Sequence, residues 1–354
     1  LRLLALIAEA MHRVGDTEPE RHVVVLEEPQ YPDPGPPMAS LLWSRRPFSA
    51  EALERLRAAT AERQKIAPVK VLCWPGETHD NPLSQFLRSP DRERFLREYP
   101  YEVSAVTDDR PFLFHTVRFG DLIATAEKGV ENEDAVQVLG TVLVTVLAIT
   151  LLAFLLPMAF ALRGRGSRGK ATLQLTYFCC LGVGFMLVEI PMLQRFSLYV
   201  GHPTWTLSTV LGSLLLGAGC GGMRTTDIRA EQVMATLRRT LLLVLVALIA
   251  LVAASPWLLS VTLTWPFPLR VLLTVAVLAP LGWPLGQALP LGIKALHGSG
   301  SLLVPWAWGL NGAASVLASV LAVAIGMQFG FTAALGAGIG CYLFALLLHR
   351  RLDG

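Results

Sequence analysis

Seven long apolar runs fill the second part of this chain and constrain its fold more than any other feature. They cover residues 136–162, 172–193, 204–222, 240–260, 268–292, 303–327 and 330–349. About 20 mostly apolar residues are enough to cross the hydrocarbon core of a bilayer. We therefore predict a mainly α-helical, polytopic transmembrane bundle of about seven helices over residues 136–349, with the lipid bilayer as its partner.

Charged residues divide the chain into two parts of different character. Residues 1–134 hold 17 Lys and Arg against 23 Asp and Glu, whereas residues 135–354 hold 13 against 4. The first part is acidic and polar, and the second is basic and apolar. This division excludes a nucleic-acid-binding protein with a broad basic face. The five cysteines are scattered without metal or disulfide spacing, so we expect no metal site.

The polar part combines helix and strand patterns in a way that indicates an α/β domain. Helices are expected over residues 1–14 and 50–63 and on both sides of Pro90, and strands over 22–26, 40–43 and 69–73. Three strands bury little apolar surface by themselves. We interpret residues 1–118 as the C-terminal part of an α/β domain that begins before Leu1, followed by a linker over 119–135.

Basic residues predict the orientation of the spans. If the spans alternate in direction, 11 of the 13 basic residues after position 134 fall on one side, and only Arg195 and Arg270 fall on the other. The positive-inside rule places the larger group in the cytoplasm. The basic tail 350–354 is therefore predicted to be cytoplasmic, and residues 1–134 are predicted to lie outside.

One candidate polar site lies within the membrane part, where charged groups are costly and often functional. Glu189 is the only acidic residue in a predicted span. Arg195 is six positions away, so the two side chains lie on different faces of a straight helix. They can pair with each other only if the helix kinks or breaks at Pro191; otherwise each needs a partner on another helix. A pocket for a cation or lipid headgroup and a structural ion pair between helices both remain open. The site comprises Glu189, Gln194, Arg195, His202 and Asn311.

A second candidate cluster comprises Asp108, Asp109 and Arg110, just before an aromatic run. Two adjacent carboxylates beside a guanidinium could hold a cationic group or a ribose. The structural alternative is a turn in which the side chains bond nearby backbone and Arg110 pairs with a carboxylate.

Glycine and proline patterns in the spans have structural explanations. Residues 217–222 match GxGxxG, but they end an apolar helix instead of following a strand, so we predict close helix packing. Pro280, Pro284 and Pro290 predict a kinked or broken helix in the fifth span.

Several strings together resemble bacterial multi-pass membrane proteins that carry a spermidine-synthase-like, S-adenosylmethionine-dependent methyltransferase-like domain. The resemblance covers most of residues 1–349. The strings are Tyr99–Ser104, Thr107–Phe112, Gly184–Glu189, Gln194–Phe196, Gly201–Pro203, Pro290–Leu296 and Pro305–Gly312.

The resemblance implies that residues 1–118 end a Rossmann-like transferase domain in a protein of the bacterial inner membrane. The cofactor loop, ribose-binding acid and catalytic acid would precede Leu1. We therefore assign no catalytic residue and expect no bound cofactor here, although the full-length protein would use S-adenosylmethionine or its decarboxylated form. That cofactor is cytosolic, in conflict with the charge rule. The alternatives are a transporter of a cationic molecule such as a polyamine, acting through Glu189, and a non-catalytic membrane scaffold.

Overall fold

The chain divides into two compact units in a computed structural model that describes residues 1–28, 38–114, 134–152, 168–296 and 303–352. The first unit contains the described residues up to Thr107 together with Phe112–Phe114. The second contains Asp108–Pro111 and the described residues from 134 onward. The predicted boundary at residue 118 therefore differs by one short segment, because residues 108–111 belong with the helices.

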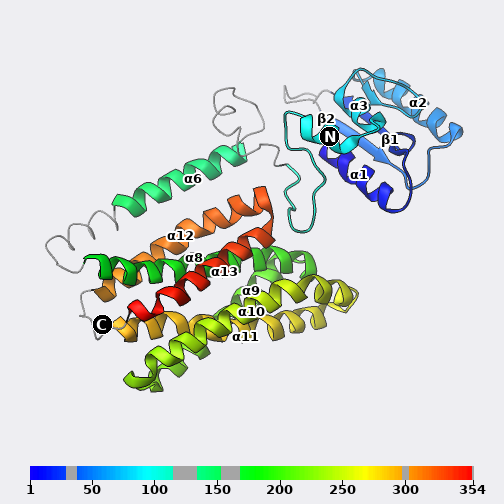
Figure 1. Ribbon diagram of the computed structural model, residues 1–354. Helices are drawn as coiled ribbons and strands as arrows, with labels where there is room; N and C mark the ends of the chain where they lie inside the picture. Colours follow the sequence, from blue (N-terminus) through cyan, green and yellow to red (C-terminus); the bar gives the residue numbers. More distant parts are fainter. Residues whose placement is uncertain (29–37, 115–133, 153–167, 297–302, 353–354) are drawn as a thin grey trace. The chain divides into compact units, whose positions relative to one another are not determined.

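The first unit is a small α/β structure (Figure 1). Its sheet has the order β2-β1-β3, and β1 pairs antiparallel with both neighbours. The three valines of β1 are buried, and α1 and α3 contribute Leu4 and Phe86 to the same core. The elements are α1 (Arg2–Arg13), the 3₁₀ turn η1 (Pro19–Arg21), β1 (Val23–Glu28), β2 (Met38–Trp43), α2 (Ala50–Gln64), β3 (Lys70–Cys73), α3 (Pro82–Arg88) and α4 (Arg92–Glu98).

Local signals placed these elements correctly to within a few residues. Ser49 caps α2 by accepting a hydrogen bond from the Ala52 N–H at 3.2 Å. Gly15 has φ of 88°, which ends α1 with a backbone conformation that favours glycine. The expected strands and helices of the polar part are therefore confirmed.

Cys73 at the end of β3 lies in the core, and its burial raises the pKa of the thiol to about 11. In a variant whose other four cysteines are alanine, we expect the native thiol to react with an aromatic disulfide reagent at pH 8 about 100-fold more slowly than in the denatured chain. Only the unfolded thiol ionises between pH ~8.5 and ~11, so its contribution to stability falls as the pH rises through that window. Equal labelling rates in the native and denatured chains would contradict this assignment.

The second unit is a bundle of long helices. Six helices in the described residues are long and apolar enough to cross a membrane, so the chain has the character of a multi-pass membrane protein. They are α8 (Arg168–Val200), α9 (Pro203–Arg224), α10 (Val233–Thr262), α11 (Phe267–Leu296), α12 (Val304–Phe329) and α13 (Phe331–Leu348), with 3₁₀ turns η4 (Thr225–Asp227), η5 (Ala230–Gln232) and η8 (His349–Arg351).

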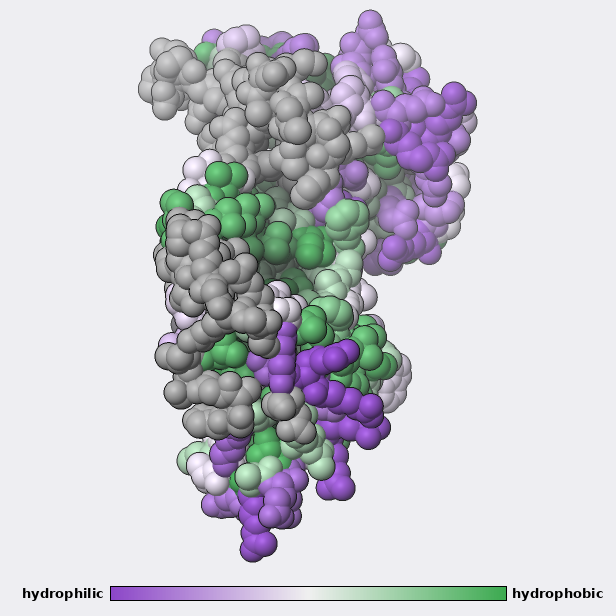
Figure 2. Space-filling model, turned by 60° about the vertical axis from the view of Figure 1, so that its left-hand side comes forward, coloured by the Kyte–Doolittle hydropathy of each residue, from purple (hydrophilic) through white to green (hydrophobic). Residues whose placement is uncertain are grey.

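The predicted first span is described only in part. It corresponds to α6 (Asp134–Thr150), whose apolar stretch is shorter than the others and which packs against α12. Residues 153–162 of that span lie outside the described residues. Many large apolar side chains on the bundle helices stay exposed, and Figure 2 shows hydrophobic surface on one face of the molecule. Lipid is the solvent that suits such a surface.

The prolines do not break their helices, so of the predicted kink or break the structure excludes the break. α8 runs through Pro191 to Val200, and α11 runs through its three prolines from Phe267 to Leu296. Proline is tolerated inside a membrane helix because neighbouring helices and bilayer exclusion of water favour the helical backbone on both sides. α8 packs against α12 and α13, and α11 packs against α9 and α10.

Helices α9 and α11 cross with their backbones in contact, as the glycine pattern predicted. A Cβ atom at Gly217 would lie 2.1 Å from the Ala279 carbonyl oxygen, and one at Gly221 would lie 2.0 Å from that of Trp283. Gly286 on α11 makes the reciprocal approach to Ala218. The residues at this crossing are spaced four apart, the small-xxx-small arrangement of close membrane helices.

Cross-helix bonds define the two ends of the bundle. At one end, Lys294 Nζ donates to the carbonyls of Thr226 at 3.1 Å and Ile228 at 3.4 Å. At the other end, Arg270 Nη1 donates to the Tyr199 carbonyl at 2.6 Å. The helices therefore alternate in direction, and Arg195 and Arg270 lie at the end opposite Lys294, as the distribution of basic residues predicted.

Candidate functional site

The strongest polar cluster in the second unit is built around Asp109. Asp108 and Asp109 occupy a turn, and Asp109 Oδ1 accepts hydrogen bonds from the Thr332 N–H at 2.9 Å and the Thr332 hydroxyl at 2.6 Å. The same oxygen lies 3.3 Å from Arg195 Nη2. The Phe331 N–H donates to the Asp109 backbone carbonyl at 2.9 Å. We call Asp109, Arg195, Ser255 and Thr332 the Asp109 clasp.

The Asp109 clasp supplies hydrogen-bond acceptors to the N–H groups at the start of α13. Residue Gly330 stands at the N-cap position without a side chain, and the first N–H groups of a helix have no partner within the helix. Asp109 supplies the missing acceptor from a distant part of the chain, and its negative charge suits the positive end of the helix.

Arg195 joins three helices and the Asp109 turn. Its side chain, in α8, donates to Ser255 of α10 at 2.8 Å and to the Thr332 hydroxyl of α13 at 2.8 Å. It is 15% exposed and Asp109 is 35% exposed, so water screens the ion pair only in part. An ion pair shielded to this degree contributes more than a surface pair, and removing one partner is costly.

The clasp joins members of two sites that the sequence treated as separate. The turn expected at Asp108, Asp109 and Arg110 is confirmed, but Asp109 bonds to the bundle, Asp108 is exposed and Arg110 is half-buried. Arg195 was considered as a partner for Glu189, and its ion pair is instead with Asp109. A hydroxyl two residues after Gly330 was a weak cue for Thr332, whereas no sequence signal identified Ser255.

The other members of the predicted intramembrane site do not converge. Asn311 Nδ2 donates to the Phe178 carbonyl at 3.1 Å, which links α12 to α8. Gln194 is exposed at the surface of α8. His202 is exposed before α9, and its ring meets the Phe267 ring edge to face at 5.7 Å. Asn311 and His202 therefore have contacts that fit structural roles.

Glu189, in contrast, has no contact that would give it a structural role among the described residues. It is half-buried in α8, and among the described residues no hydrogen bond or ion pair reaches its carboxyl group. A carboxylate within a membrane span is costly unless it is paired, hydrated or protonated.

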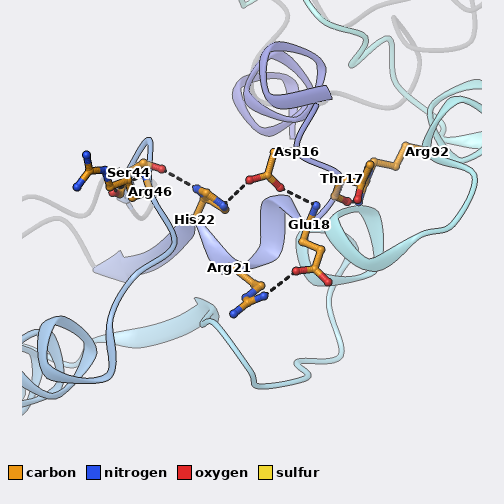
Figure 3. A network of polar contacts seen from close by, with 8 residues as sticks. All are labelled: Asp16, Thr17, Glu18, Arg21, His22, Ser44, Arg46 and Arg92. Carbon is orange, nitrogen blue, oxygen red and sulfur yellow. Dashed lines mark hydrogen bonds and ion pairs between the residues drawn. The ribbon is translucent and has the colours of Figure 1, made fainter. Parts of the chain in front are cut away.

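A polar network in the first unit fixes the chain between α1 and β1 (Figure 3). The buried ring of His22 has Nδ1 2.9 Å from the Ser44 carbonyl oxygen and Nε2 3.0 Å from Asp16 Oδ2. Arg21 pairs with Glu18 at 2.8 Å on the surface beside it. These contacts hold β1 and the segment after β2 together.

The described residues contain no metal centre, and no relative is identified. Among the described residues, no group of His, Cys, Asp and Glu is arranged to hold a metal ion. No known protein family matches the chain, and no curated protein or solved structure is similar to it.

Proposed function

We propose that this chain is the membrane-bound C-terminal portion of a spermidine-synthase-like transferase, whose full-length form transfers an aminopropyl or methyl group from an S-adenosylmethionine-type donor. The observation that carries the proposal is the Asp109 clasp. It joins two strings on which the resemblance rests, Thr107–Phe112 and Gln194–Phe196, although they are separated by more than 80 residues. An α/β domain that continues into a membrane bundle is the architecture that the resemblance implies.

Other strings of the resemblance also fall at helix contacts. Gly184 packs against the Tyr342 ring, where a Cβ atom would lie 2.9 Å from Cε2. Asn311 bonds to α8, as described above. These strings are thus explained by assembly of the bundle, which supports the architecture and leaves the chemistry to the α/β domain.

Exposed apolar side chains on strand β2 support the proposal that the α/β domain is larger in the full-length protein. Met38, Leu42 and Trp43 are exposed by 62%, 40% and 48%, and β2 is an edge strand of the sheet. An edge strand with exposed apolar side chains is a liability unless further structure covers it. Additional strands and helices of a transferase domain would provide that cover.

Donor binding tests the proposal directly. We expect the full-length protein to bind S-adenosylmethionine or decarboxylated S-adenosylmethionine in titration calorimetry. The analogue S-adenosylhomocysteine should compete, whereas adenosine alone should compete weakly. Absence of heat with both donors, in protein that melts cooperatively, would overturn the transferase proposal.

The side of the membrane provides an independent test. The clasp lies at the bundle end opposite Lys294, so the positive-inside rule puts Asp108 outside, whereas a transferase that uses a cytosolic donor needs it inside. In a chain without its native cysteines, Asp108→Cys should be protected from an impermeant maleimide in intact cells if the protein is such a transferase. Labelling in intact cells would show that Asp108 lies outside, where the cytosolic donor is absent, and this would overturn the proposal.

A second candidate function, transport of a cationic molecule, is favoured by the unpaired state of Glu189 among the described residues. It predicts that Glu189→Gln abolishes spermidine flux in proteoliposomes, whereas Glu231→Gln, at an exposed site in η5, does not. Unchanged flux in Glu189→Gln would exclude this function.

The scaffold hypothesis makes a different prediction for the same variant. It ascribed a structural ion pair to Glu189, so that Glu189→Gln would lower the melting temperature. Because no partner reaches this carboxyl among the described residues, we expect Glu189→Gln to melt at or above the wild-type temperature in detergent. A fall of several degrees would show that Glu189 has a structural partner after all.

A further inference from the structure

A partly open cavity of about 240 Å³ lies in the second unit, between α8, α9, α11, α12 and α13. Most of its wall is apolar, and no charged side chain contributes to it. Glu189 and the Asp109 clasp are not among its lining residues, so the cavity is independent of both functions proposed above. The residues that matter for its chemistry are Phe185, Gly286, Leu289, Pro290, Asn311 and Tyr342.

Three polar groups on this wall lack their usual partners within the described part of the chain. Tyr342 is only 2% exposed, and no hydrogen bond to its hydroxyl is found there. Asn311 uses its amide N–H on Phe178, and no donor reaches its side-chain oxygen. Pro290 has no N–H, so the Gly286 carbonyl lacks the donor that an ordinary helix supplies four residues later.

These groups favour a ligand that donates a hydrogen bond. Two of the three are acceptors only, and the third can accept as well as donate. A donor that reaches an acceptor in this mainly apolar pocket gains more than it would in water, because the surroundings screen the hydrogen bond less.

The wall and the volume limit the ligand further. A charged group such as a polyamine ammonium would enter an apolar space without a counter-charge, at high cost. A dry cavity of ~150 Å³ holds benzene, so this one suits about ten non-hydrogen atoms, far fewer than a whole phospholipid.

We propose that this cavity binds an uncharged amphiphile of about ten non-hydrogen atoms, a medium-chain alcohol in chemical class. Its hydroxyl lies among Gly286, Asn311 and Tyr342, and its alkyl chain lies against Phe185 and Leu289. A lipid acyl chain could fill the same space but carries no hydrogen-bond donor, so the two occupants can be distinguished.

Photolabelling of the purified full chain in detergent tests the site. The probe is an octanol that carries a diazirine, and mass spectrometry of peptides locates the adducts. We expect adducts on Leu289 and Tyr342, with 1-octanol competing at least tenfold better than octane. Leu289→Trp fills the cavity and should remove these adducts, whereas Leu272→Trp, 62% exposed on the same helix, should not.

Each contrary outcome overturns a defined part of the proposal. Adducts confined to exposed positions, or adducts that persist in Leu289→Trp, would show that the probe does not enter the cavity. Equal competition by octane would identify a hydrocarbon chain as the occupant. If Leu289→Trp fails to fold, Tyr342→Phe keeps the shape of the wall and removes one hydroxyl. The preference for 1-octanol over octane should then fall at least threefold, and an unchanged preference would contradict the proposed hydrogen bonding.

Discussion

Replacing Gly221 by valine is expected to separate α9 from α11 and to cost the bundle more than ~3 kcal/mol, above the usual range for overpacking. The Cβ atom would lie 2.0 Å from the Trp283 carbonyl oxygen and 2.9 Å from its carbon. These are backbone atoms of a helix, so they cannot rotate away as a flexible side chain could. Thermal unfolding in detergent, followed by size-exclusion chromatography, would measure the loss as a melting temperature lowered by more than 10 °C or as aggregation.

The same helix offers a matched control for this substitution. Gly219 lies two residues away, and a Cβ atom there meets no atom within 4 Å. Gly219→Val changes helix propensity as much as Gly221→Val does, so it should melt close to the wild type. If the two variants melt at the same temperature, the crossing of α9 and α11 does not depend on contact between their backbones.

This crossing also shows what the sequence could predict. The GxGxxG string was interpreted by its context, at the end of an apolar run, and that context predicted helix packing correctly. The partner glycines on α11 lay in a span whose prolines dominated the interpretation. A kinked or broken helix was predicted there, and the helix is continuous. Whether proline breaks a helix depends on the helices packed around it, which local sequence does not specify.

The candidate sites were predictable by residue type but not by partner. Glu189, Arg195 and Asp109 were each recognised from their chemistry. Their pairing was not, because Asp109 and Arg195 are 86 positions apart and periodicity describes only neighbours on one element. The cavity was also missed, since it is formed by residues from five helices and is not tied to a motif.

Replacing Asp109 by alanine is expected to loosen the start of α13 and to destabilise the bundle by about 2–3 kcal/mol. Loss of the helix cap contributes about 1 kcal/mol. The remainder comes from Arg195, which is left without its carboxylate in a site that water reaches only in part, so it is less than the 3–5 kcal/mol of a fully buried pair. Hydrogen exchange at Thr332 should become faster in Asp109→Ala, because its N–H loses the side-chain acceptor, whereas the Phe331 N–H bonds to the Asp109 backbone carbonyl, which the substitution keeps.

A double-mutant cycle separates the cap from the ion pair. Asp109→Asn keeps an oxygen that can accept from Thr332 but removes the charge, so its effect should largely vanish when Arg195 is already glutamine. Asp108→Asn is the control, because Asp108 is exposed beside it in the same turn. Additive effects of Asp109→Asn and Arg195→Gln would mean that the two charges do not stabilise each other. The clasp would then act only as a cap on α13, and the link between the two strings would lose its electrostatic basis.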